Sequence, residues 1–273
     1  MTTVSDGFVD VPGGYLHYQQ QGHGPDVVLI NGGNVDLRMW DTTVAWLADI
    51  ARVTTWDCRD TGLSSVSSEP YSEIDDLSSV LDAAGVSRAT LAGVSNGARQ
   101  ALAFAHRHPE RVANVCVVGG SFGEFPEPSA QETASRQKML EHFAERERLL
   151  REQGTYAASA WDADGWCPAL GPADRRRMIG WQVANDRIMF MEHYYGVELE
   201  PPVKTRFAEI DVPIAILVGE RDFEGTQLWA RRLADQAARA SLLVAPEADH
   251  FPMLSAPQTF ERFLRDALAD ATA

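Results

Sequence analysis

Short apolar runs alternate with amphipathic stretches along most of the chain. Runs at residues 26–30, 51–56, 88–94, 112–118, 212–218 and 240–244 are typical of strands, several of them apolar on both faces. Helical spacing follows at residues 40–50, 74–84, 98–106, 226–238 and 257–268. This alternation predicts an α/β fold with a mostly parallel, doubly wound sheet. Residues 8–11 and 15–20 flank Pro12-Gly13-Gly14 and predict a hairpin before it.

The strand rhythm stops between residues 121 and 205. A long charged helical pattern at 131–152 is followed by an aromatic-rich region, and Pro201-Pro202 closes the segment. No clear buried strand is visible there. We therefore predict a helical cap at 121–205, inserted between the first part of the core at 1–120 and the second part at 206–273.

Composition narrows the function classes. The 273 residues carry a net charge of −15, which disfavours nucleic-acid binding because a polyanion would be repelled. Cys58, Cys116 and Cys167 lack metal-ligand spacing and are expected to be reduced thiols. The first residues show no secretion signal, and no run of about 18 apolar residues occurs. We expect a cytoplasmic protein without membrane contact, metal or other cofactor.

The best candidate nucleophile is Ser95. It lies in Gly93-Val-Ser-Asn-Gly97, between a β-rich run and an Ala-rich helical pattern. A strand that turns directly into a helix needs small residues on both sides of the turning residue, whose side chain is then exposed above the sheet. The alternative interpretation is an ordinary serine in a Gly-rich loop.

A serine hydroxyl needs a base, usually a histidine held by a carboxylate. His250 follows the last strand run and Asp222 follows the strand run after the insertion. Rival acids are Asp249, which should point away from His250, and Glu124. Among the other histidines, we expect His106 and His108 to cap a helix end. We expect His142 and His193, which lie in the insertion, at the surface or lining a pocket.

An oxyanion that develops during acyl transfer needs two hydrogen-bond donors. We assign them to the N–H groups of Asn96 and Gly33, because Gly32-Gly33 lets the backbone approach a substrate closely. A plain tight turn is the alternative for this glycine pair. Aromatic residues of the insertion are expected to line an apolar substrate pocket, although simple packing against the sheet would give the same pattern; these are Trp161, Trp166, Trp181, Phe190 and Tyr194.

Three motifs in this order, Gly-Val-Ser-Asn-Gly, Gly-Glu-Arg-Asp and Asp-His-Phe-Pro, resemble the α/β-hydrolase family with a helical cap. The resemblance covers essentially the whole chain and implies the order nucleophile, acid, histidine. Asn31-Gly-Gly-Asn34 departs from the His-Gly pair that is commoner in this family at the corresponding position. Together with Asp57-Cys-Arg-Asp-Thr-Gly62 it is similar to the branch that contains aclacinomycin methylesterase, which hydrolyses a methyl ester on a polycyclic polyketide.

The sequence thus predicts a serine hydrolase that cleaves a carboxylic ester or lactone of an apolar small molecule through an acyl-enzyme. A methyl ester of a polyketide-like molecule is one such substrate. Haloalkane dehalogenase and epoxide hydrolase mechanisms are excluded because they use an Asp where Ser95 stands. The alternatives are a lyase, epimerase, cyclase or perhydrolase on the same fold, or a ligand-binding receptor. The sequence does not specify the oligomeric state.

Overall fold

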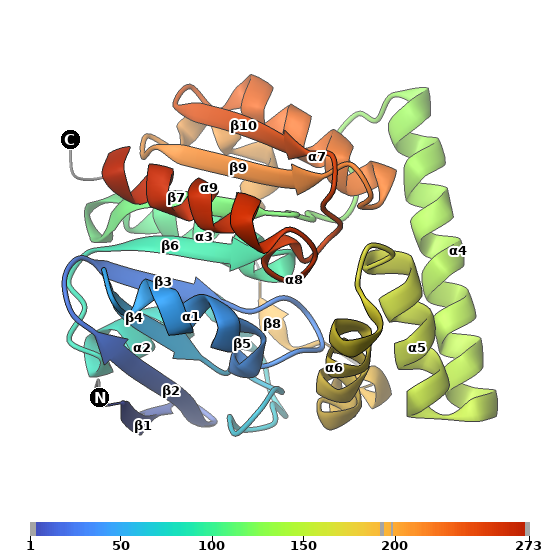
Figure 1. The fold of residues 1–273 in the computed structure, drawn as a ribbon, viewed down its shortest axis with the longest axis horizontal. Helices are drawn as coiled ribbons and strands as arrows, with labels where there is room; N and C mark the ends of the chain where they lie inside the picture. The colour runs from blue at the N-terminus through green and yellow to red at the C-terminus, as the bar shows by residue number, and fades with distance from the viewer. Residues whose placement is uncertain (1–3, 192–193, 198, 271–273) are drawn as a thin grey trace.

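In the computed structural model, which describes residues 4–191, 194–197 and 199–270, helices pack on both faces of an eight-stranded sheet (Figure 1). The strands lie side by side in the order β1, β2, β4, β3, β6, β7, β9 and β10. Their bounds are Ser5–Val11 (β1), Gly14–Gly22 (β2), Asp26–Ile30 (β3), Arg52–Trp56 (β4), Ala89–Val94 (β6), Val112–Val118 (β7), Ile214–Gly219 (β9) and Ala240–Ala245 (β10).

The first two strands form the predicted antiparallel hairpin, with Val11 opposite Gly14 at the turn. β2 pairs antiparallel with β4, and every pairing from β4 to β10 is parallel. The prediction of a mostly parallel sheet is confirmed. Because parallel strands end at the same edge of a sheet, the segments after β3, β6, β9 and β10 meet there.

Alternating residues of the central strands pack into two apolar layers, one on each face of the sheet. Val28 and Ile30 of β3 pack with residues of α2, α3 and α7, whereas Val27 and Leu29 pack with α1 and α9 on the opposite face. Figure 1 shows α1 and α9 in front of the sheet and α3 behind it. The helix bounds are Asp41–Leu47 (α1), Glu73–Ala83 (α2), Asn96–Arg107 (α3), Glu224–Gln236 (α7), Pro252–Ser255 (α8) and Pro257–Asp270 (α9).

Between β7 and β9 the chain forms α4 (Ala130–Gln153), α5 (Thr155–Trp166) and α6 (Pro172–Ala184), which stand beside the carboxyl ends of the parallel strands (Figure 1). A capping box starts α4: the Ser129 hydroxyl accepts a hydrogen bond from the Glu132 N–H at 3.2 Å, and the Glu132 carboxylate accepts one from the Ser129 N–H at 2.7 Å. Glu132 also pairs with Arg232 of α7 at 2.8 Å, which ties the start of α4 to the core.

Two short elements were not expected. Tyr71–Ser72 (β5), in a stretch that reads as loop, pairs with Gly196–Val197 (β8) of the insertion. Strands of two residues are too short to show any periodicity. Single turns of 3-10 helix complete the fold at Leu37–Trp40, Pro109–Arg111, Asp186–Phe190, Val203–Thr205 and Phe207–Glu209. None of the helices in the described residues is both long and apolar enough to cross a membrane.

Candidate active site

Ser95 forms the tight turn between β6 and α3. Its backbone has φ 55° and ψ −115°, a conformation that residues with a side chain rarely adopt. The turn is fixed by two hydrogen bonds, from the Ser95 N–H to the Val118 carbonyl at 2.9 Å and from the Ala98 N–H to the Ser95 carbonyl at 3.1 Å. Backbone strain of this kind persists where surrounding structure enforces it, and it is concentrated at functional sites.

The two glycines of the motif are required by close backbone approach. A Cβ atom at Gly93 would lie 2.2 Å from the carbonyl oxygen of Gly97, and one at Gly97 would lie 2.4 Å from the carbonyl oxygen of Ile30. Both contacts involve backbone atoms, which cannot move aside cheaply. Small residues must therefore flank Ser95, as predicted, for a direct steric reason.

His250 and Asp222 form a buried hydrogen-bonded pair at the same edge of the sheet. The His250 Nδ1 atom lies 2.8 Å from the Asp222 Oδ2 atom. An ionised carboxylate only accepts hydrogen bonds, so Nδ1 carries the proton and the Nε2 lone pair is left to accept another. The second oxygen of Asp222 accepts the Phe223 N–H at 2.7 Å, which fixes the carboxylate plane. Burial raises the pKa of Asp222 above its ordinary value, and His250 opposes this effect.

Gly119, at the end of β7, leaves room for this pair. Its φ is +53°, and a Cβ atom there would lie 3.0 Å from His250 Nδ1 and 3.2 Å from Asp222 Oδ2. The position is thus restricted both by its left-handed backbone and by the hydrogen bond beside it. In the sequence, Gly119 is simply the residue that follows the apolar run at 112–118, and its spacing gives no sign of this role.

The rival acids lie elsewhere. Asp249 is turned away from the imidazole, and its carboxylate accepts hydrogen bonds from the Phe251 N–H at 3.0 Å, the Ser255 hydroxyl at 2.8 Å and the Ala169 N–H at 3.0 Å. Glu124 lines a separate depression at the start of α4. Of the three carboxylates, Asp222 is the one bonded to His250.

The loop after β3 brings Gly32 and Gly33 over the Ser95 turn. A Cβ at Gly32 would lie 3.7 Å from Ser95 Cβ, whereas Gly33 has nothing within 4 Å and faces open space. Asn31 anchors the loop, because its side chain donates to the Trp56 carbonyl at 2.8 Å and accepts from the Trp40 indole N–H at 3.0 Å. The departure from the common His-Gly pair therefore places a buried amide that joins β3 to β4.

Two cavities meet at this loop, since Gly33 and Asn34 line both. The larger, about 200 Å³, is here called the His250 cavity; Ser95, His250 and Phe251 line it from the core, and Phe143, Arg146, Asp162, Trp166 and Gln182 line it from the cap. The smaller, about 70 Å³, is called the Trp56 cavity; it lies on the Asn96 side and is bounded mainly by the segments after β3 and β4 and by α2. Ser95 lines the His250 cavity and not the Trp56 cavity.

Polar groups of the cap reach the His250 cavity. Arg146 pairs with Asp162 at 3.3 Å, and Asp162 also bonds to His142 Nε2 at 2.9 Å. Trp166 lies against His250: the two ring centroids are 4.4 Å apart, and the Trp166 carbonyl accepts the His250 N–H at 3.2 Å. The cap therefore supports the histidine loop directly.

Comparison with known proteins gives the family. Residues 27–263 match the sequence model of the alpha/beta hydrolase family. The chain belongs to that family. It is 27% identical to zearalenone hydrolase of Cladophialophora bantiana over 91% of this chain and 90% of the relative, and 25% identical to 3-oxoadipate enol-lactonase 2 of Acinetobacter baylyi over 86% and 85%. The fold also matches the crystal structure of the enol-lactonase from Burkholderia xenovorans LB400, with a TM-score of 0.77, 23% identity and coverage of 96% and 100%.

Within this alpha/beta hydrolase, the aromatic residues assigned to the substrate pocket take different positions. Trp166 lines the His250 cavity and Tyr194 lines the Trp56 cavity. The other three line neither: Trp161 lies at the surface and donates to the His142 carbonyl at 3.1 Å, Trp181 is buried in the apolar cluster below the cap, and Phe190 is 61% exposed. Aromatic content alone did not separate pocket from packing, as the alternative interpretation stated.

Two further histidines make structural contacts. His106, at the end of α3, contacts Glu209 at 2.9 Å, and buried His142 bonds to Asp162. His193 lies outside the described residues. Over the part of the chain that the structure describes, no group of three or more His, Cys, Asp or Glu side chains has the arrangement of a metal site.

Proposed function

We propose that this chain is a serine hydrolase that cleaves a carboxylic ester or lactone through an acyl-enzyme. The observation that carries the proposal is the 2.8 Å contact between His250 Nδ1 and Asp222 Oδ2, in a cavity that Ser95 also lines. The pair leaves Nε2 of the imidazole available as a base on the side of the serine turn. The names of the relatives, a hydrolase and an enol-lactonase, agree with this reaction class.

In the proposed reaction, Ser95 Oγ attacks the ester carbonyl and its proton passes to His250 Nε2. The Asn96 and Gly33 N–H groups hold the oxyanion, and Asp222 stabilises the imidazolium. The C–O bond then breaks, and the alcohol leaves with the proton from His250; in a lactone this alcohol stays attached to the acyl group. Water activated by His250 releases the acid and restores Ser95.

The narrower choice of substrate is also a proposal. The stretches Asn31-Gly-Gly-Asn34 and Asp57–Gly62 resemble those of the methylesterase branch, which favours a methyl ester of a polyketide-like or other apolar molecule. The enol-lactonase among the relatives favours a lactone. The same triad can cleave an open ester or a lactone ring.

The test combines a covalent probe with turnover. A fluorophosphonate should add once to the native chain, at Ser95, as read by intact mass and peptide mapping, and a panel of aryl esters, methyl esters and lactones should show hydrolysis. Labelling at Ser95 without turnover of any panel member would favour a non-hydrolytic reaction on the same triad. Absence of both labelling and turnover would contradict the proposal and favour a receptor.

A further inference from the structure

Arg146 of α4 is a fixed positive charge on the cap wall of the His250 cavity. Among the described residues that line this cavity, no other is an arginine or a lysine. Ser95 and His250 line the same cavity from the core, so a substrate whose scissile carbonyl lies at Ser95 extends toward this wall. A charge that is partly withdrawn from water is costly unless it is hydrogen-bonded, so the partners of Arg146 decide its role.

Two contacts place the guanidinium group itself at the cavity wall. Its Cζ atom lies 5.1 Å from the centroid of the Phe143 ring, and its Nη1 atom lies 3.3 Å from Asp162 Oδ2. Phe143 and Asp162 both line the His250 cavity. Because the charged end of Arg146 contacts two side chains of this wall, that end, and not only the aliphatic stem, borders the space that Ser95 lines.

Most of the hydrogen-bonding capacity of Arg146 is unused. A guanidinium has five N–H donors, and Arg146 makes one hydrogen bond to the described residues, the 3.3 Å contact with Asp162. Its side chain is 25% exposed, and the nitrogens without a partner, Nε and Nη2, keep accessible surface. By contrast, Arg175 of α6 donates to both oxygens of Asp164 at 2.6 and 2.7 Å. Arg146 can therefore donate to a ligand without giving up its existing partner.

The charges around Arg146 favour a neutral ligand atom. Asp162 balances the Arg146 charge and is fixed from its other side by His142, whose Nε2 atom lies 2.9 Å from Asp162 Oδ1. Asp222 places a second carboxylate behind His250. An anionic ligand would thus meet two carboxylates and one cation that is already paired, whereas a neutral oxygen can accept from Arg146 without this repulsion.

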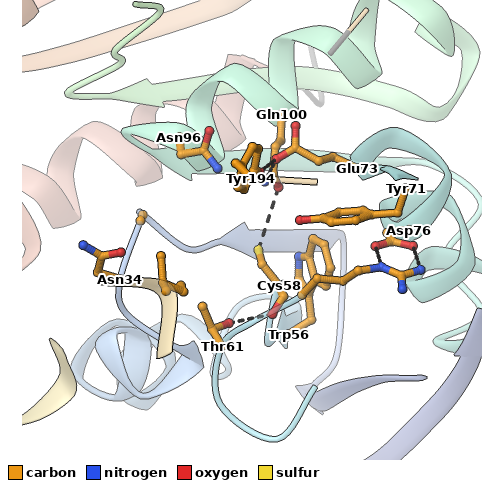
Figure 2. Close-up of a pocket in the computed structure, with 14 residues that line it drawn as sticks. Asn34, Trp56, Cys58, Thr61, Tyr71, Glu73, Asp76, Asn96, Gln100 and Tyr194 are labelled. Carbon is orange, nitrogen blue, oxygen red and sulfur yellow. Dashed lines mark hydrogen bonds and ion pairs between the residues drawn. The ribbon is translucent and has the colours of Figure 1, made fainter. Parts of the chain in front are cut away.

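The charged groups of the Trp56 cavity, in contrast, bind one another (Figure 2). Both oxygens of Asp76 accept hydrogen bonds from Arg59, at 2.6 and 2.9 Å, and Glu73 accepts one from Arg99 at 2.5 Å. The Arg59 side chain is 2% exposed, and Ser95 does not line that cavity. A charged donor that shares a cavity with Ser95 therefore comes from the cap.

We propose that Arg146 is a specificity residue whose guanidinium donates a hydrogen bond to a neutral oxygen in the part of the substrate that lies against the cap. The inference rests on the proposed ester or lactone hydrolysis and narrows its substrate class to esters or lactones with a hydroxyl or keto oxygen away from the scissile bond. A substrate with a methyl group in place of that oxygen leaves the donor unpaired and is disfavoured.

Two pairs of esters test this, and the members of each pair differ by a hydroxyl in place of a methyl group. Methyl meta-hydroxybenzoate and methyl meta-methylbenzoate vary the acyl part, whereas meta-hydroxybenzyl acetate and meta-methylbenzyl acetate vary the alcohol part. The ratio of kcat/KM within each pair is compared between variants, so that differences in intrinsic reactivity cancel. Arg146→Met keeps a long side chain and removes the donors. We expect it to lower the hydroxyl preference in at least one pair about tenfold, the effect of one hydrogen bond to a charged group.

Arg175→Met is the matched control, because Arg175 also pairs with an aspartate of α5 but lines neither cavity. Its ratios should equal those of the wild type. If the unpaired Asp162 prevents Arg146→Met from folding, Asp162→Asn is added and the double variant is compared with Asp162→Asn alone, with the same fall expected. Ratios within about twofold of the reference in both pairs, or an equal fall in Arg175→Met, would overturn the inference.

Monomethyl isophthalate, which carries a carboxylate in place of the meta hydroxyl, separates a neutral ligand atom from an anionic one. We expect the wild type to prefer methyl meta-hydroxybenzoate. A preference for the carboxylate that Arg146→Met abolishes would overturn the choice of a neutral oxygen.

The failure of this inference is distinct from failure of the proposed function. A wild-type chain that hydrolyses these esters with Ser95 labelled, and whose ratios do not respond to Arg146, retains the function and loses only the specificity role. A wild-type chain that hydrolyses none of the esters and is not labelled loses both.

Discussion

Gly119→Ala is a sharp test of the geometry around His250. The substitution introduces a Cβ 3.0 Å from His250 Nδ1 and 3.2 Å from Asp222 Oδ2, so the imidazole and carboxylate must shift by a few tenths of an ångström. Its left-handed backbone, with φ +53°, adds about 1–2 kcal/mol of strain to the folded state. In the proposed mechanism a displaced His250 loses its alignment with Ser95, and we expect kcat/KM to fall about 10- to 100-fold, or ~1.4–2.7 kcal/mol in barrier height.

Gly85→Ala is the control. Gly85 also has a left-handed φ, +64°, but an added Cβ meets nothing within 4 Å. Urea unfolding should show a similar loss of stability in both variants, while ester hydrolysis by folded protein should fall only in Gly119→Ala. Activities of the two variants within about twofold of each other, well below the tenfold step that ~1.4 kcal/mol produces, would refute the idea that Gly119 protects the His250–Asp222 contact.

Two further predictions concern specificity and pH. Trp166→Ala should change the relative kcat/KM of bulky and small esters, because Trp166 lines the His250 cavity. Trp181 is buried, so Trp181→Ala should lower the free energy of unfolding by about 3–5 kcal/mol and affect all esters alike. Equal effects of Trp166→Ala on all esters would argue against its pocket role. The hydrogen bond to Asp57, followed by the one to Asp6, raises the pKa of His17 despite burial. Protonated His17 therefore stabilises the folded state fully below about pH 6.5, and this contribution is lost as the pH rises through the raised folded-state pKa. Urea melts should show the difference in unfolding free energy between wild type and His17→Gln shrinking with increasing pH. A constant difference would contradict this.

Much of the fold could be predicted because the strands carry continuous apolar runs. Val112–Val118 (β7) and Ile214–Gly219 (β9) are buried on both faces, so their hydrophobic pattern alone indicates parallel neighbours and helices above and below. The cap could not be resolved to the same level. Its helices α5 and α6 mix aromatic and charged residues on several faces, and the pairing of β5 with β8 joins segments far apart in sequence.

Some residues of the candidate site could be predicted from the sequence and others could not. Ser95, Asp222 and His250 could be located because each follows a strand at a shared edge, and the structure brings Asp222 and His250 into contact. The Trp56 cavity could not, because its walls come from loops and helix starts far apart in the sequence, and Trp56 itself ends a strand as any core aromatic does. Arg146 and Gln182 of the cap were missed because spacing within a polar helix does not show which residue faces a cavity.

The most direct test of the central claim is turnover of a good ester by purified Ser95→Ala beside wild type, with circular dichroism to show that both are folded. Ser241→Ala, at an exposed position of β10, is the control for loss of a hydroxyl. We expect Ser95→Ala to lose about a thousandfold or more in kcat, since the proposed nucleophile and base act as a unit, while Ser241→Ala keeps wild-type activity. A folded Ser95→Ala that retains more than about a tenth of wild-type activity, a barrier change below ~1.4 kcal/mol, would contradict the acyl-enzyme mechanism.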